Sequence, residues 1–473
     1  MEDAHGEESP GFSISVCQTQ HNIRVTRFTT TSIKPAKKTN PHWITLSNLD
    51  RLFDNFYTPV ILYYPYKAGR CVGEVAEKLK ESLAEVLVAF YPLAGRVVEN
   101  EHEVARLHCN DAGAVFSEAY VDGVLDDLKA QEGYHPAPEL NGMVAAGLLS
   151  EDLTFSANGD GIPALVIQVT VFSCGGISVA MNWNHKVADG FSGFYFIKSW
   201  SNICRGNPIS PLPVHDRSLI QPRHPPQVIV DIANTVRIDH PRPRPAQSAH
   251  DPQQIAVIHF EQGFVEKLRR EATKNGRGPF TALDCLSAHL WRVLTRLRGL
   301  SGRQEVQFVA CIDARRKLSP APPPGLFSNA CVVSYCAVTA DDLLARPLSD
   351  VSDIIRGAIG EVGDETIRST VDWVQLQGNA KLSLVLPHQL ASGKALYTSS
   401  WAAFPMYELD FGWGIPGFAI RNSTNNPYLD GLVYFLPPPP NHGQLSALLH
   451  LPKSIITKLV ANPSLLLSKF QGP

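Results

Sequence analysis

The sequence lacks most of the patterns that would tie it to a metal, a nucleotide or a membrane. Its nine cysteines are dispersed between Cys17 and Cys336 without a Cys-x-x-Cys pair, and neither His-x-x-x-His nor His-Glu-x-x-His occurs. It also lacks a phosphate-binding loop and a dinucleotide-binding fingerprint in its strand-to-helix setting. We therefore expect no metal and no permanently bound cofactor.

Long apolar runs and an excess of charge of one sign are also missing. No apolar stretch has the length needed to span a bilayer, and the acidic, polar start differs from a signal peptide. The formal net charge of -3 gives no reason to expect nucleic acid as a partner. Because an odd number of dispersed cysteines indicates a reducing compartment, we expect a cytoplasmic protein without membrane contact.

Proline is concentrated in one part of the chain. At 473 residues and 44% hydrophobic content, the sequence can form two domains with substantial cores. Residues 206–254 are dense in proline, which excludes regular helix and central strand, so we predict an extended linker there. The linker separates an N-terminal domain (12–205) from a C-terminal domain (255–473), and residues 1–11 are predicted to be a disordered tail.

Strand and helix patterns alternate on both sides of the linker. Residues 72–90 combine apolar residues at helical spacing with strong helix formers. Two β-rich runs, 164–172 and 177–183, flank Gly175-Gly176 and predict a hairpin followed by a helix. In the second half, a helix is expected after Thr281, with strands around it. This alternation predicts mixed α/β layers.

The stretch "NHKVADG" carries the first candidate for chemistry. His185 follows the predicted hairpin, where a scaffold is rigid and a polar side chain is accessible, and an imidazole can accept a proton near neutral pH. The alternative is a histidine satisfied in the core or exposed at a strand end. Asp189 could orient His185 or hold the loop. Because no Gly-x-Ser-x-Gly nucleophile motif is present, we favour the structural role.

The second distinctive string is "DFGWG", from Asp410 to Gly414. Two glycines around a tryptophan indicate a backbone that turns sharply or approaches another segment closely. Although Asp-Phe-Gly also occurs in protein kinases, the other kinase motifs are absent from the sequence. An architectural role is therefore expected.

Together, "HKVADG" and "DFGWG" resemble the signatures of the plant BAHD acyl-CoA-dependent acyltransferases, and "YPLAGR", "LSAHLWR" and "DARRKLSPAPPPGLFSN" match as well. The resemblance implies two similar chloramphenicol-acetyltransferase-like domains, a monomer, and direct transfer in a ternary complex with His185 as general base. It implies that Asp189 pairs with Arg315 or Arg316. The other residues to which it gives a structural role are Gly190, Asp410, Gly412, Trp413 and Gly414.

The segment around the histidine resembles the hydroxycinnamoyl-CoA transferase branch, which implies acyl-CoA as co-substrate and an aromatic acyl group. Branch members that use shikimate or quinate have an arginine where this sequence has Ala403, and alanine cannot pair with a carboxylate. We therefore favour an amine acceptor, with an alcohol of the shikimate, quinate or aliphatic type as the alternative. Trp183, Trp401 and Glu408 are further candidates for the acceptor and acyl pocket.

The resemblance places CoA near the helix start at Thr281 and near three basic residues, Arg315, Arg316 and Lys317. A structural or solvent-facing role for these cations carries equal weight. Two other functions remain open: a non-catalytic CoA-binding homologue, and a thioesterase that transfers the acyl group to water. The small-molecule partners expected are a hydroxycinnamoyl-CoA and an amine or alcohol.

Overall fold

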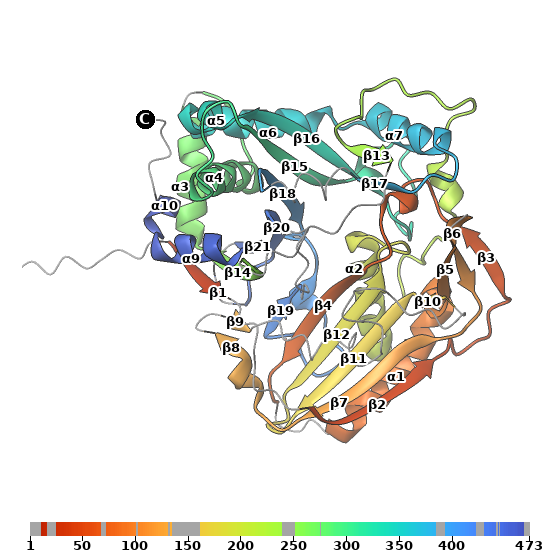
Figure 1. The fold of residues 1–473 in the computed structure, drawn as a ribbon. Coiled ribbons are helices and arrows are strands. Elements are labelled where there is room, and N and C mark those ends of the chain that lie inside the picture. Colours follow the sequence, from red (N-terminus) through yellow and green to blue (C-terminus); the bar gives the residue numbers. More distant parts are fainter. Residues whose placement is uncertain are drawn as a thin grey trace, which may run out of the picture.

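A computed structural model gives the fold as two mixed sheets with helices packed against them (Figure 1). No helix in the described ranges is both long and apolar enough to cross a membrane. The structure describes residues 11–16, 25–67, 72–100, 103–130, 133–134, 161–238, 251–274, 276–384, 393–421, 430–440, 443 and 445–467.

The first large sheet has six strands in the order β19-β4-β12-β11-β7-β2. Its central strands β4 and β12 are buried along their whole length, including the polar side chains of Ser178, Asn182 and Asn184. Two helices, α1 (Val72–Ala89) and α2 (Gly190–Cys204), are joined by a hydrogen bond from Trp200 Nε1 to Ser82 Oγ. The strands are β19 (Phe418–Ile420), β4 (Tyr57–Tyr64), β12 (Ile177–Asn184), β11 (Leu165–Phe172), β7 (Ala114–Val121) and β2 (Val25–Ile33).

The second large sheet has seven strands in the order β1-β14-β21-β20-β18-β15-β16. Its main covering helix, α4 (Ala282–Leu297), is almost entirely buried and begins with a capping box between Thr281 and Asp284. The strands are β1 (Phe12–Val16), β14 (Gln253–Phe260), β21 (Leu445–Pro452), β20 (Leu432–Leu436), β18 (Ala395–Ser400), β15 (Glu305–Asp313) and β16 (Cys331–Thr339). The other helices near it are α3 (Gln262–Thr273), α5 (Ala340–Ala345), α6 (Leu348–Glu361), α9 (Lys453–Ala461) and α10 (Ser464–Leu467).

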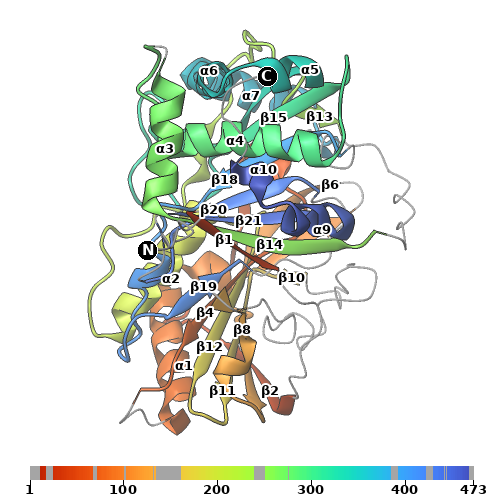
Figure 2. The ribbon, with the colours of Figure 1, turned by 90° about the vertical axis from the view of Figure 1, so that its left-hand side faces the viewer.

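Each half of the chain contributes one strand to the sheet of the other half. The prediction of two contiguous domains did not include this exchange. β1, from the predicted N-terminal domain, pairs with β14 in the second sheet, and Figure 2 shows it crossing beside that strand. Conversely, β19 from the C-terminal half pairs with β4 at the edge of the first sheet (Figure 1). A short edge strand is stabilised by whichever sheet offers unpaired backbone groups, so sequence position alone does not assign it.

The described part of the proline-rich segment, residues 206–238, makes specific contacts with the rest of the protein. It includes a 3₁₀ turn, η5 (Arg217–Ile220), and a short strand, β13 (Val236–Ile238), which pairs with β17 (Leu382–Leu384). Arg223 forms an ion pair at 2.5 Å with Asp372 of α7 (Asp364–Leu376). Side-chain and strand contacts therefore hold the described part of the predicted connector in place.

The remaining described strands form small sheets. A four-stranded sheet has the order β10-β5-β6-β3, and β8 pairs with β9. These strands are β10 (Ile162–Pro163), β5 (Arg96–Asn100), β6 (Glu103–Cys109), β3 (His42–Thr45), β8 (Lys129–Ala130) and β9 (Gly133–Tyr134).

The structure confirms the mixed α/β class and the main predicted elements. α1 begins at the predicted residue, and Gly175, with φ of +78°, turns the chain between β11 and β12. α2 follows the His185 loop, and α4 follows Thr281. The predicted disordered tail lies outside the described residues except for Gly11.

Candidate active site

His185 lies directly after β12, where the chain leaves the first sheet. Its backbone N–H donates to the Phe56 carbonyl at 2.8 Å, and its own carbonyl accepts from Asn329 Nδ2 at 2.7 Å. The imidazole stacks on Phe53 with ring centroids 4.2 Å apart and also meets Phe56 at 4.8 Å. Both backbone polar groups of His185 are thus hydrogen-bonded, while its ring packs against two aromatic side chains.

The environment of His185 favours the neutral imidazole. Burial, opposed in part by the negative charge of Asp189, lowers the pKa of His185 to about 4. Its Nδ1 atom has no hydrogen-bond partner among the described residues. A neutral imidazole can accept a proton at physiological pH.

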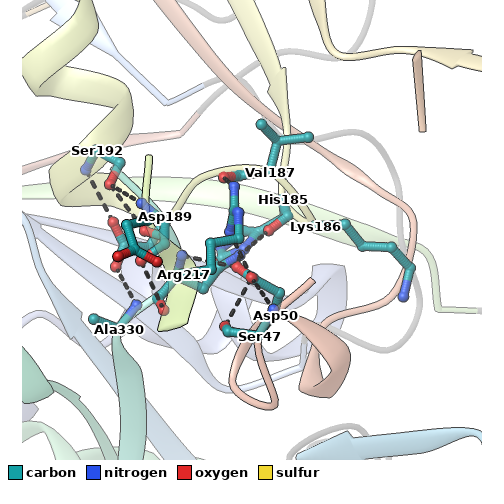
Figure 3. Close-up of polar contacts among 12 residues, drawn as sticks. Ser47, Asp50, His185, Lys186, Val187, Asp189, Ser192, Arg217 and Ala330 are labelled. Atoms are coloured by element: carbon teal, nitrogen blue, oxygen red, sulfur yellow. Dashed lines mark hydrogen bonds and ion pairs between the residues drawn. The ribbon is translucent and has the colours of Figure 1, made fainter. Parts of the chain in front are cut away.

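Asp189 is held in a buried ion pair with Arg315, and Figure 3 shows its hydrogen bonds to Ser192 and Ala330. Its carboxylate accepts from both terminal nitrogens of Arg315, at 2.7 and 3.2 Å, and from the Ser192 and Ala330 N–H groups at 2.9 Å each. Burial alone would raise the pKa of Asp189, but the charge of Arg315 and these hydrogen bonds hold it below its ordinary value. The carboxylate also caps α2, so it joins that helix to the start of β16.

A second buried ion pair braces the same loop, and no sequence motif marks either of its residues. Asp50 accepts from Arg217 Nη1 at 2.5 Å and from the Asn329 side chain at 2.8 Å (Figure 3). Arg217 in turn donates to the Val187 carbonyl at 2.8 Å, and Lys186 Nζ donates to the Phe53 carbonyl at 2.8 Å. The loop from His185 to Asp189 is therefore fixed from the N-terminal half, the linker and the C-terminal half at once.

The predicted pocket role of Trp183 gains no support, because the side chain is buried beneath α2 with 1% of its surface exposed. Its Nε1 donates to the Ala188 carbonyl at 3.1 Å. A methyl group on Gly193 of α2 would come within 2.3 Å of the indole, so only glycine allows this approach. Trp401 lies at the first residue of the helix, where its Nε1 would be 3.5 Å from a Cβ on Gly190.

The Asp410–Gly414 loop packs against the scaffold that carries His185. Asp410 Oδ1 accepts from the Gly412 and Gly414 N–H groups at 2.7 and 2.9 Å, and both glycines have positive φ, +105° and +107°. Phe411 is fully buried against Trp200 of α2, with ring centroids 4.9 Å apart. Trp413 stacks on Phe411. These contacts are architectural.

The remaining candidates fall in different environments. Arg315 is buried in the Asp189 pair and also contacts Asp313 at 3.1 Å, so the structure gives it a structural role in place of the predicted CoA phosphate contact. Arg316 is exposed and Lys317 half-buried beside it. Thr281 is exposed and caps α4 through its side chain.

The two acceptor candidates near Trp401 are both exposed. The Glu408 side chain is 70% exposed and pairs with Lys198 at 3.2 Å, so its predicted pocket role gains no support. Ala403 offers no polar group at the position where the branch members have arginine, and it is exposed.

Comparison with known proteins agrees with the motifs. Residues 23–466 match the model of the Transferase family. The shikimate O-hydroxycinnamoyltransferase of Nicotiana tabacum is 30% identical over 427 residues, covering 89% of this chain and 95% of that protein. The chain belongs to the BAHD acyltransferase family. This BAHD protein is also 30% identical over 430 residues to a hydroxycinnamoyl-CoA:5-hydroxyanthranilate N-hydroxycinnamoyltransferase of Avena sativa, covering 88% and 94% of the two chains.

Solved structures share the fold of this BAHD protein. Vinorine synthase aligns with a TM-score of 0.69 and 23% identity over 95% of this chain and 99% of its own. The F. graminearum TRI101 protein in complex with coenzyme A and T-2 mycotoxin aligns with a TM-score of 0.70 and 19% identity over 89% and 97%. Family membership makes this protein an acyltransferase enzyme.

Proposed function

We propose that this BAHD enzyme transfers a hydroxycinnamoyl group from its CoA thioester to an amine or hydroxyl of a small acceptor, with His185 as general base. The observation that carries the proposal is the state of His185. Burial lowers the pKa of its imidazole to about 4, its Nδ1 atom has no hydrogen-bond partner among the described residues, and its loop is held by two buried ion pairs. The names of the relatives from Nicotiana tabacum and Avena sativa, one an O- and one an N-hydroxycinnamoyltransferase, support the acyl group.

The proposed reaction needs one proton transfer in each direction. His185 takes the proton from the acceptor O–H or N–H as the acceptor lone pair attacks the thioester carbonyl. The tetrahedral adduct then breaks its carbon–sulfur bond, and the imidazolium returns the proton to the CoA thiolate. General-base help of this kind contributes about 10²–10⁴-fold, so the enzyme must also hold both substrates together.

Coenzyme A enters this proposal as a co-substrate. Arg316 and Lys317 directly follow Arg315, which is tied to Asp189, so phosphate contacts at these two residues would lie on the same rigid segment as the site. The solved complex of TRI101 with coenzyme A, which shares the fold, supports this part of the proposal. We further propose a cytoplasmic location, since the seven cysteines in the described residues are all free thiols. The monomeric state is proposed from the family resemblance alone.

The test is a product assay with coumaroyl-CoA and a panel of acceptors: shikimate, quinate, 5-hydroxyanthranilate, agmatine, spermidine and a long-chain alcohol. An ester or amide product supports acyl transfer. Release of free CoA at the same rate with and without acceptor would show a thioesterase instead. Binding of CoA without any turnover would indicate a non-catalytic homologue.

A further inference from the structure

A four-residue segment of the first half, Phe53–Phe56, contacts the imidazole of His185. It lies between the 3₁₀ turn η1 (Asp50–Leu52) and β4, and it forms no helix or strand of its own. The Phe53 ring stacks on the imidazole, with ring centroids 4.2 Å apart and planes at 18°, and the Phe56 ring is tilted by 45° at 4.8 Å. Two aromatic side chains from one short segment therefore touch the proposed base directly.

Three consecutive residues, from the last residue of β12 onward, each donate one hydrogen bond to this segment. The bonds run from Asn184 Nδ2 to Asn55 Oδ1 at 2.5 Å, from the His185 N–H to the Phe56 carbonyl at 2.8 Å, and from Lys186 Nζ to the Phe53 carbonyl at 2.8 Å. Because the segment has no helix or strand hydrogen bonds of its own, contacts of this kind fix its backbone. The placement of both rings against His185 therefore depends on these three bonds.

Lys186 makes the least expected of these contacts. Only 6% of Lys186 is exposed, and a buried ammonium group is costly unless it is paired and hydrogen-bonded. Besides the Phe53 carbonyl, its Nζ has Glu99 Oε1 at 3.9 Å, and Glu99 Oε2 accepts from Asn55 Nδ2 at 3.3 Å. Figure 3 shows the Lys186 side chain pointing away from Asp189, so this contact is separate from the Asp189 ion pair.

We propose that Phe53 and Phe56 are positioning residues for the general base and that Lys186 holds them against its imidazole. The inference rests on the proposed function, because it concerns the same histidine. A general base must keep its nitrogen within hydrogen-bond reach of the acceptor proton, and a misplacement of about 1 Å can cost about 100-fold in rate. The two rings restrict the orientation of the imidazole and exclude water from it, which favours its neutral form.

The first test is Lys186→Met, which keeps a side chain of similar length and removes the donor to Phe53. With coumaroyl-CoA and the best acceptor of the panel, we expect kcat to fall about 10–100-fold while both KM values change little. In wild type, kcat/KM should be flat between about pH 8 and 5.5. In the variant it should fall about tenfold over that range, because a solvated imidazole has a pKa near 6.5 and is protonated below it. Lys186→Arg, which keeps a cationic donor, should recover most of the rate.

The second test changes no charge. Phe56→Ala removes a ring that is 38% exposed, so it should affect folding little, and it leaves in place Asp189 and Arg421, the charged groups that act on the imidazole. We expect the same two changes, a lower kcat and a kcat/KM that falls toward pH 5.5, each by about tenfold. A rise of KM alone would make Phe56 a substrate contact and would overturn its assignment as a positioning residue.

Lys80→Met is the matched control. Lys80 is also partly buried and pairs with Glu118 at 2.5 Å and with Glu77 at 2.8 Å, but it lies in α1, and its kinetics and pH profile should equal those of wild type. If Lys186→Met lost stability in urea unfolding but kept the wild-type kcat and a flat pH profile, the lysine would be merely structural and the proposal would be overturned. Should that variant fail to fold, Phe56→Ala still decides the question. No product from wild type with any acceptor would instead remove the proposed function itself.

Discussion

Replacing Asp189 by asparagine tests whether the loop that carries His185 depends on its buried ion pair. The carboxylate accepts from two Arg315 nitrogens and two backbone N–H groups, and the residue is fully buried. Asparagine has only one acceptor oxygen. Its amide N–H₂ would therefore point at the Arg315 or backbone donors, to which it cannot form hydrogen bonds. Arg315 would also lose its closest counter-charge.

The magnitude follows from the contacts that remain. Breaking a buried ion pair by removing one partner typically costs about 3–5 kcal/mol in the free energy of unfolding. Arg315 keeps contacts with Asp313 at 3.1 Å and with the Ser328 carbonyl at 2.8 Å, so we expect a value near the lower end, about 3 kcal/mol. The measurement is urea unfolding followed by circular dichroism. The control is Asp353→Asn, whose exposed pair with Arg277 should contribute about 0–1 kcal/mol.

The pH dependence gives an independent check. Because the pKa of Asp189 is lowered in the folded protein, its contribution is present above the unfolded-state value of about 3.9 and is lost as pH falls through the folded-state pKa. The stability difference between wild type and Asp189→Asn should therefore be constant from about pH 7 to 5 and shrink below about pH 4. A variant as stable as Asp353→Asn at pH 7 would refute the reasoning.

Two further predictions concern His185 and the helix behind it. Since the pKa of His185 is about 4, kcat/KM for an alcohol acceptor should be nearly constant between about pH 8 and 5.5. A loss of about tenfold over that range would instead indicate an ordinary histidine pKa near 6.5. Gly193→Ala should destabilise the protein by about 1–3 kcal/mol, measured by urea unfolding, because its methyl group would overlap Trp183. The matched Gly357→Ala in α6, where nothing lies within 4 Å, should be neutral or stabilising, and equal effects would contradict the packing account.

Local patterns predicted the elements that position His185. The glycine turn between β11 and β12, the end of β12 and the start of α2 depend on neighbours in sequence, and the structure has them as expected. The same is true of α1, whose apolar spacing is sufficient to define it. These elements could be predicted from the sequence because backbone propensity and periodicity are local properties.

Contacts between distant segments could not be predicted from the sequence in the same way. Asp50 and Arg217 are 167 positions apart and sit in stretches without a motif, so nothing in the sequence indicated their pairing. The exchange of β1 and β19 between sheets depends on which edges are open in the folded protein.

The most direct test of the account is the rate of acyl transfer by His185→Ala in a single turnover with coumaroyl-CoA and the best acceptor of the panel. The substitution removes the proposed base and leaves the Asp189–Arg315 and Asp50–Arg217 pairs intact. We predict a rate about 10²–10⁴-fold below wild type, with unchanged CoA binding and a native circular dichroism spectrum. A folded variant that transfers the acyl group at the wild-type rate would contradict the assignment of His185 as the general base.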